Sequence, residues 1–118
     1  MDELLDRLVT KVGIDRAVAS KAVGIILAFL LKEGPADKVQ ALINQMPGAE
    51  TVMQTAANEG GFGMGGIMGV GTKLMAAGLG MDQMQGVTRE IIAYARDKLG
   101  EDTVGEIVGS IPGLGQFV

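Results

Sequence analysis

The side chains that most often carry out catalysis are nearly absent from this sequence. It contains no histidine and no cysteine, so it lacks the commonest general base and metal ligand as well as the thiolate nucleophile. Its only two serines, Ser20 and Ser110, fall inside predicted helices, and no base is available to activate either hydroxyl. We therefore predict that no residue is catalytic and that the protein is not an enzyme.

Carboxylates are the remaining candidates for chemistry. Asp2 and Asp6 are four residues apart, as are Asp102 and Glu106, so each pair shares one face of a predicted helix. Such a pair could hold a cation weakly. The helix dipole, which favours acidic residues in a first turn, explains both pairs better. We predict no metal site, no cofactor and no cofactor-binding residue.

The charge balance limits the partners that the protein can bind. The net charge is −4, and it is spread over the whole chain without a cluster of basic residues. Proteins that bind nucleic acids depend on such clusters to displace counterions from the phosphates, so we predict no nucleic-acid binding. The acidic start of the chain also lacks the basic region and apolar run of a signal peptide, and we expect a cytoplasmic protein.

Apolar residues at helical spacing, separated by helix-breaking motifs, predict an all-α protein. Asp15 and Asp82 are placed to cap the two longest helices by accepting backbone N–H groups. The middle of the first long helix is apolar nearly all round and should be central, and the ring of Tyr94 should lie in the core. In chain order, we predict helices over residues 2–12, 16–33, 37–46, 49–58, 67–79, 83–99 and 102–111.

An internal duplication is the strongest pattern in the chain. With a shift of 65 residues, the segment 26–29 (ILAF) lies over 91–94 (IIAY), and Met46-Pro47-Gly48 lies over Ile111-Pro112-Gly113. With a two-residue slip, 13–15 (GID) also matches 80–82 (GMD). A series of matches in one order indicates a repeat. We predict two tandem pseudo-repeats of a three-helix unit packed into one helical bundle.

The chain is short enough to form a single helical domain over residues 1–118. The first copy of the repeat covers residues 1–58 and the second covers 67–118. A Gly/Met-rich connector, residues 59–66, joins them.

Residues 60–80 do not follow the helical pattern. They contain nine glycines and a single charged side chain, Lys73. Since each glycine inside a helix costs about 1 kcal/mol relative to alanine, residues 60–66 should be mostly loop. The simplest interpretation is a linker, but its apolar side chains are unusual for a linker in water. We therefore predict a candidate interaction surface made of Phe62, Met64, Ile67 and Met68 together with the apolar C-terminal residues Leu114 and Phe117.

These features favour a non-catalytic interaction or structural protein that self-associates or binds a protein partner. One alternative is a membrane-surface protein that inserts residues 60–80, although the glycines make this stretch a poor membrane span. Another alternative is a carrier that encloses a small apolar ligand between its helices.

The order of the motifs resembles that of a known group of proteins. Met-Pro-Gly-Ala-Glu at 46–50 is followed by the glycine-rich run, and then by Ile-Pro-Gly-Leu at 111–114. This order is similar to that of small bacterial helical proteins classed only as a domain of unknown function. The resemblance covers most of the chain and implies a helical fold and a bacterial source. It transfers no activity, cofactor or binding residue.

Overall fold

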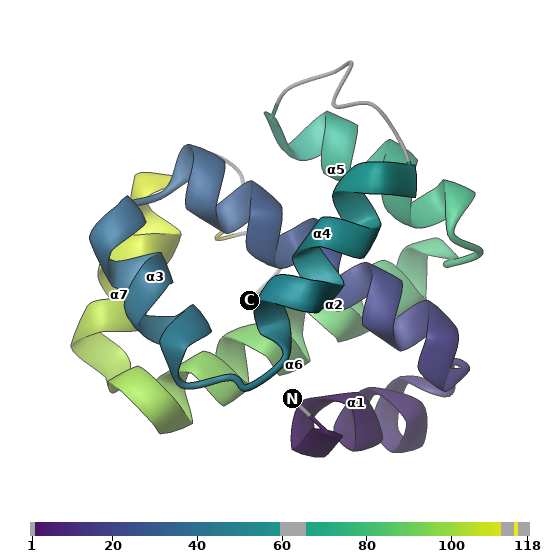
Figure 1. The fold of residues 1–118 in the computed structure, drawn as a ribbon, viewed down its shortest axis with the longest axis horizontal. Helices are drawn as coiled ribbons and strands as arrows, with labels where there is room; N and C mark the ends of the chain where they lie inside the picture. Colours follow the sequence, from purple (N-terminus) through teal and green to yellow (C-terminus); the bar gives the residue numbers. More distant parts are fainter. Residues whose placement is uncertain (1, 60–65, 112–114, 116–118) are drawn as a thin grey trace.

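The computed structural model describes residues 2–59, 66–111 and 115, and of residues 2, 55–59 and 66–70 it describes only the backbone. Every regular element in these ranges is a helix (Figure 1). The elements are α1 (Asp2–Arg7), the π-helix η1 (Leu8–Val12), α2 (Arg16–Glu33), α3 (Ala36–Asn44), α4 (Ala49–Glu59), α5 (Gly66–Ala76), α6 (Met81–Leu99) and α7 (Glu101–Ser110). The predicted all-α fold is confirmed.

Helix α2 lies at the centre of the molecule. Helix α4 crosses it with the most extensive contact between any two described elements, and α3, α5, α6 and the α1–η1 segment also touch it (Figure 1). Because neighbours surround it, most of α2 is removed from water, and its buried residues are Ala19, Ala22, Val23, Gly24, Ile25, Ile26, Leu27, Phe29 and Leu30. This position explains the apolar sequence of the helix.

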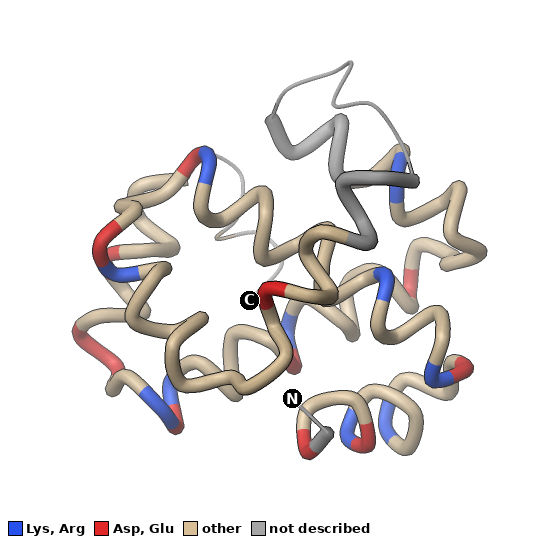
Figure 2. The backbone as a smooth tube through the Cα atoms, viewed as in Figure 1, with Lys and Arg blue, Asp and Glu red and all other residues tan. Residues whose placement is uncertain are grey.

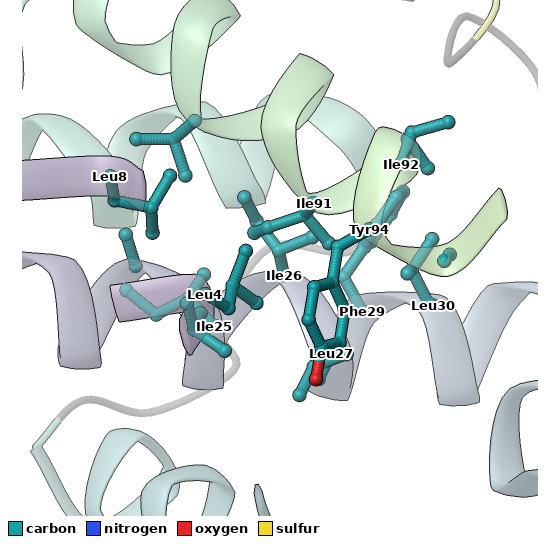
Figure 3. Close-up of a cluster of buried hydrophobic side chains, with 14 of the residues drawn as sticks. Leu4, Leu8, Ile25, Ile26, Leu27, Phe29, Leu30, Ile91, Ile92 and Tyr94 are labelled. Carbon is teal, nitrogen blue, oxygen red and sulfur yellow. The ribbon is translucent and has the colours of Figure 1, made fainter. Parts of the chain in front are cut away.

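The second long helix, α6, packs beside α2 and contributes to the same core. Ile91 and Tyr94 lie close to Ile26 and Phe29 of α2 (Figure 3). Tyr94 is only 3% exposed, so its ring belongs to the core as predicted. The buried side chains of all the described helices form one contiguous cluster, which is almost wholly aliphatic.

The first helix departs from the predicted regular α-helix. It is an α-helix to Arg7 and continues as a π-helix from Leu8 to Val12. Gly13 ends it with φ of 79°, the left-handed conformation expected of a glycine at this position. On α6, Gly86 faces this segment, and a Cβ atom there would lie 3.3 Å from Cγ2 of Val12. The glycine therefore permits the close approach of η1 to α6.

Several predicted helix boundaries are wrong by a few residues. The third predicted helix ends at Asn44 because Gln45 and Met46 form turns, with N–H groups that donate to carbonyls three residues earlier. The predicted helix over 67–79 covers 66–76, since Gly78 stops it. By contrast, the helix over 16–33 has the predicted bounds.

The predicted capping roles of two aspartates are not fulfilled. Asp15 occupies the N-cap position of α2, but its side chain makes no capping hydrogen bond. Asp82 lies inside α6, whose N-cap is Gly80. The predicted match of Gly13 with Gly80 is also wrong in conformation, because Gly78 is the glycine with positive φ before α6.

Candidate interaction surface

The predicted interaction residues fall mostly outside the part of the chain that the structure describes. Ile67 and Met68 belong to α5, but their side chains are not described. The other four predicted residues, Phe62, Met64, Leu114 and Phe117, lie outside the described residues altogether.

A neighbouring surface is well defined, at the junction of α5 and α6. We call residues 75–81 the methionine turn. The Leu79 N–H donates to the Leu74 carbonyl (3.1 Å), and the Gly78 N–H donates to the Met75 carbonyl (3.0 Å). These two bonds form a Schellman motif, in which a residue with positive φ ends a helix and satisfies its last carbonyls. Gly78 supplies that conformation with φ of 104°.

Buried residues and a third hydrogen bond hold the turn in place. Leu74 and Leu79 are buried and join the hydrophobic core. On the other side of the turn, the Gly80 N–H donates to Oε1 of Gln83 (2.9 Å), which satisfies a backbone group at the start of α6. The methionine turn is therefore fixed to the body of the protein at both ends.

This rigid turn exposes two large apolar side chains. Met75 is 60% exposed and Met81 is 64% exposed. Among the residues that the structure describes, the only other exposed large hydrophobic residue is Val9, at 37%. Apolar side chains held at a fixed place in water are typical of a contact surface, and methionine adapts to many partner shapes.

The turn from η1 into α2 has the same order of residues, although it follows a π-helix and not an α-helix. Gly13 has positive φ, the next residue, Ile14, is buried, and α2 begins two positions later at Arg16. In the methionine turn, the corresponding series is Gly78, a buried leucine and the start of α6 at Met81. The two turns thus share a glycine with positive φ, a buried aliphatic residue and the start of a long helix at the same spacing.

The side chains at these equivalent positions differ in kind. Three residues before its glycine, the first turn exposes Thr10 where the second exposes Met75. At the helix start, Arg16 pairs with Asp6 (Nη1 to Oδ1, 2.7 Å), whereas Met81 is apolar. The first turn therefore carries an ordinary solvated surface, and the second does not.

The methionine turn itself contains no charged residue, and the exposed Asp82 follows it directly. Lys73 is the only charged residue between Glu59 and Asp82, and its Nζ atom is buried. Burial lowers the pKa of Lys73, and the positive charge of Lys32 lowers it further. The tube is accordingly tan throughout the turn at the right of Figure 2.

Elsewhere on the described surface, charged side chains pair with one another. Glu90 of α6 lies 3.8 Å from Nε of Arg7 and 3.5 Å from Nζ of Lys11. These ion pairs tie the first helix to α6. Arg7 also approaches Asp97, at 3.6 Å.

One carboxylate of each pair considered as a weak cation ligand is engaged in the same way. Asp6 pairs with Arg16, and Glu106 pairs with Lys38 of α3. In the described ranges, no group of three acidic side chains is placed to hold a metal ion. Ser110 donates a hydrogen bond to the carbonyl of Glu106 in its own helix, which is a structural arrangement.

An open groove of about 220 Å³ lies between α2, α3 and α4. It is smaller than typical ligand pockets, which measure roughly 300–1,000 Å³. Leu31, Ile43 and Met53 supply its apolar walls, and Gln40, Glu50 and Gln54 supply its polar groups. No described helix is long and apolar enough to cross a membrane.

Comparison of the chain with protein-family models, curated proteins and solved structures gives no match. The resemblance to small bacterial helical proteins therefore stays a prediction.

Sequence reasoning did not select Met75 and Met81, although both are visible in the sequence. The signal was the shift of 65 residues without the two-residue slip, which places Gly13-Ile14 over Gly78-Leu79. In that register the two methionines stand where the first turn has Thr10 and Arg16.

Proposed function

We propose that this protein is a non-catalytic helical protein that associates with a second copy of itself through the methionine turn. One observation carries the proposal: a turn fixed at both ends exposes Met75 and Met81 where the equivalent turn exposes polar side chains. A surface of this kind suits a two-fold contact, in which the same patch meets itself. A stable interface buries about 800 Å² per partner, so the turn forms the centre of a larger contact.

Charge favours a second copy over other occupants of this surface. The protein carries a net charge of −4, which repels another copy over most of its surface. The methionine turn itself contains no charged residue, which reduces this repulsion there. A membrane surface is less well supported, because anionic headgroups attract exposed basic residues and the nearby Lys73 has a buried amine.

We also propose that the fold consists of two three-helix units within one domain. The α1–η1 segment, α2 and α3 make up the first unit, and α5, α6 and α7 make up the second. Helices α2 and α6 begin 65 positions apart, at Arg16 and Met81, and so do α3 and α7, at Ala36 and Glu101. The packing supports the correspondence, because α5 contacts α2 while α1 and η1 contact α6. Each first segment thus packs across onto the long helix of the other unit.

Light scattering coupled to size-exclusion chromatography tests the association. We expect the mass of the full chain to rise from 12.2 kDa towards twice that value with concentration. The double variant Met75→Glu/Met81→Glu should require about tenfold more protein for the same rise, since charge is brought into the contact. Ala41→Glu is the matched control, because Ala41 is exposed on α3 at the other end of the molecule (Figure 1). A constant 12.2 kDa, or equal effects of the two variants, would contradict the proposal.

A further inference from the structure

The described methionine side chains differ in accessibility, and Met53 is intermediate. Met46 and Met84 are buried, at 1% and 7% exposure, whereas Met75 and Met81 are 60% and 64% exposed. Peroxides oxidise the methionine sulfur, and the rate follows the access of the oxidant to that atom. The chain has no cysteine that would react first. The two residues of the methionine turn are therefore its most accessible described sulfur atoms.

We propose that Met75 and Met81 are sites of reversible oxidation by hydrogen peroxide, and that their oxidation releases self-association. This inference rests on the proposed function. In the reaction, a sulfur lone pair attacks one peroxide oxygen, the O–O bond breaks, and a sulfoxide and water are formed. Sulfur is oxidised by two electrons and the peroxide is reduced. Methionine sulfoxide reductases reverse the change with a thiol reductant.

The position of the two residues makes such a change effective without unfolding the protein. A sulfoxide is polar and chiral, so it disrupts an apolar contact in which it must be buried. Because Met75 and Met81 project from the turn, their oxidation leaves the core residues Leu74 and Leu79 in place. Oxidation of the buried Met46 or Met84 would instead damage the core.

Oxidation and association are then linked in both directions. If sulfoxide weakens the contact, the contact disfavours the sulfoxide by the same factor at equilibrium. The rate of oxidation is lowered for a separate reason, because a second copy covers the sulfur atoms and limits the access of peroxide. Met75 and Met81 should therefore oxidise more slowly in concentrated protein than in dilute protein.

The test treats the full chain with hydrogen peroxide at low and at high protein concentration. Peptide mass mapping follows each methionine, and light scattering follows the mass. In dilute protein, Met75 and Met81 should oxidise about tenfold faster than Met46 and Met84. Concentrated protein should slow only the first two. Oxidised protein should need about tenfold more concentration to associate, and a sulfoxide reductase should restore the original mass.

The variant Met75→Leu/Met81→Leu keeps two apolar side chains at the same positions and removes both sulfur atoms. It should associate like the wild-type protein and resist peroxide. If peroxide still dissociates this variant, or if the four methionines oxidise at equal rates, the inference is wrong. An untreated wild-type protein that stays monomeric would overturn the proposed function itself, and with it the coupling. Association that is unaffected by selective oxidation would overturn the inference alone.

Discussion

The turn from η1 into α2 and the turn from α5 into α6 differ in the side chains that they expose. Both have a glycine with positive φ, followed by a buried aliphatic residue and the start of a long helix. The first exposes Thr10 and an ion-paired Arg16, whereas the second exposes Met75 and Met81. The proposed self-association at the second turn rests on this difference in side chains.

Helices η1 and α5 differ at one further position in the same register. Leu8 of η1 is fully buried, and 65 positions later Lys73 of α5 places its amine out of solvent. At this one position, a buried aliphatic side chain in η1 corresponds to a buried amine in α5.

The largest expected effect concerns the buried residues that anchor the two turns. Ile14→Ala and Leu79→Ala should each lower the free energy of unfolding by about 2–4 kcal/mol, because each leaves a cavity in the core. Urea denaturation measures both. A much smaller loss of unfolding free energy for one of the two variants would contradict the structural correspondence of the turns.

The next effect concerns the glycines with positive φ. Gly13→Ala and Gly78→Ala should each cost about 1–2 kcal/mol from backbone strain alone, since a Cβ atom at either site meets open space. The control is Gly105→Ala in the interior of α7, where a Cβ atom also meets open space and φ is not positive. This variant should gain up to about 1 kcal/mol from helix propensity. Losses at all three glycines would contradict the account of the turns.

A double substitution in the first turn tests whether exposed methionines are sufficient for association. The variant Thr10→Met/Arg16→Met gives the first turn the side chains of the second. Each molecule then carries two associating turns, so assemblies larger than a dimer should form. They should appear at protein concentrations within about tenfold of those at which the wild type dimerises. Sedimentation velocity measures the size. If the variant assembles no further than the wild type, two methionines on this backbone are not sufficient for association.

The smallest effect concerns Lys73 and pH. Its pKa in the folded protein lies below the ordinary 10.5, so the unfolded chain binds more protons between the two values. The free energy of unfolding should therefore rise with pH as it approaches 10.5 from below. Lys73→Leu should remove this contribution, and the difference between the two proteins in urea denaturation should show it. A difference that is constant with pH would contradict the lowered pKa.

The sequence predicts the helices of this fold well because their signals are local. The apolar run in α2 and the stops at Gly13 and Gly34 depend on a few neighbouring residues. The caps at Asp15 and Asp82 were predicted less well. Whether a side chain caps a helix depends on the position at which the helix begins. In this protein the glycine turn before each long helix sets that position.

The candidate surface could be predicted only in part. Composition drew attention to the Gly/Met-rich segment, but exposure depends on which face of α5 packs against α2. Lys73 illustrates this, because a lone lysine in an apolar segment suggests a solvated face, yet its amine lies inside. Met75 and Met81 became distinctive only when both turns were compared in one register.

Disulfide trapping tests the central claim most directly, because the chain has no cysteine of its own. Met75→Cys and Met81→Cys each place one thiol on the methionine turn, and Ala41→Cys places one on α3. Under mild oxidation at a concentration where the wild type associates, we predict that a thiol on the turn forms a covalent dimer and that Ala41→Cys stays monomeric. Equal amounts of dimer from all three variants, or none from either turn variant, would contradict self-association through the methionine turn.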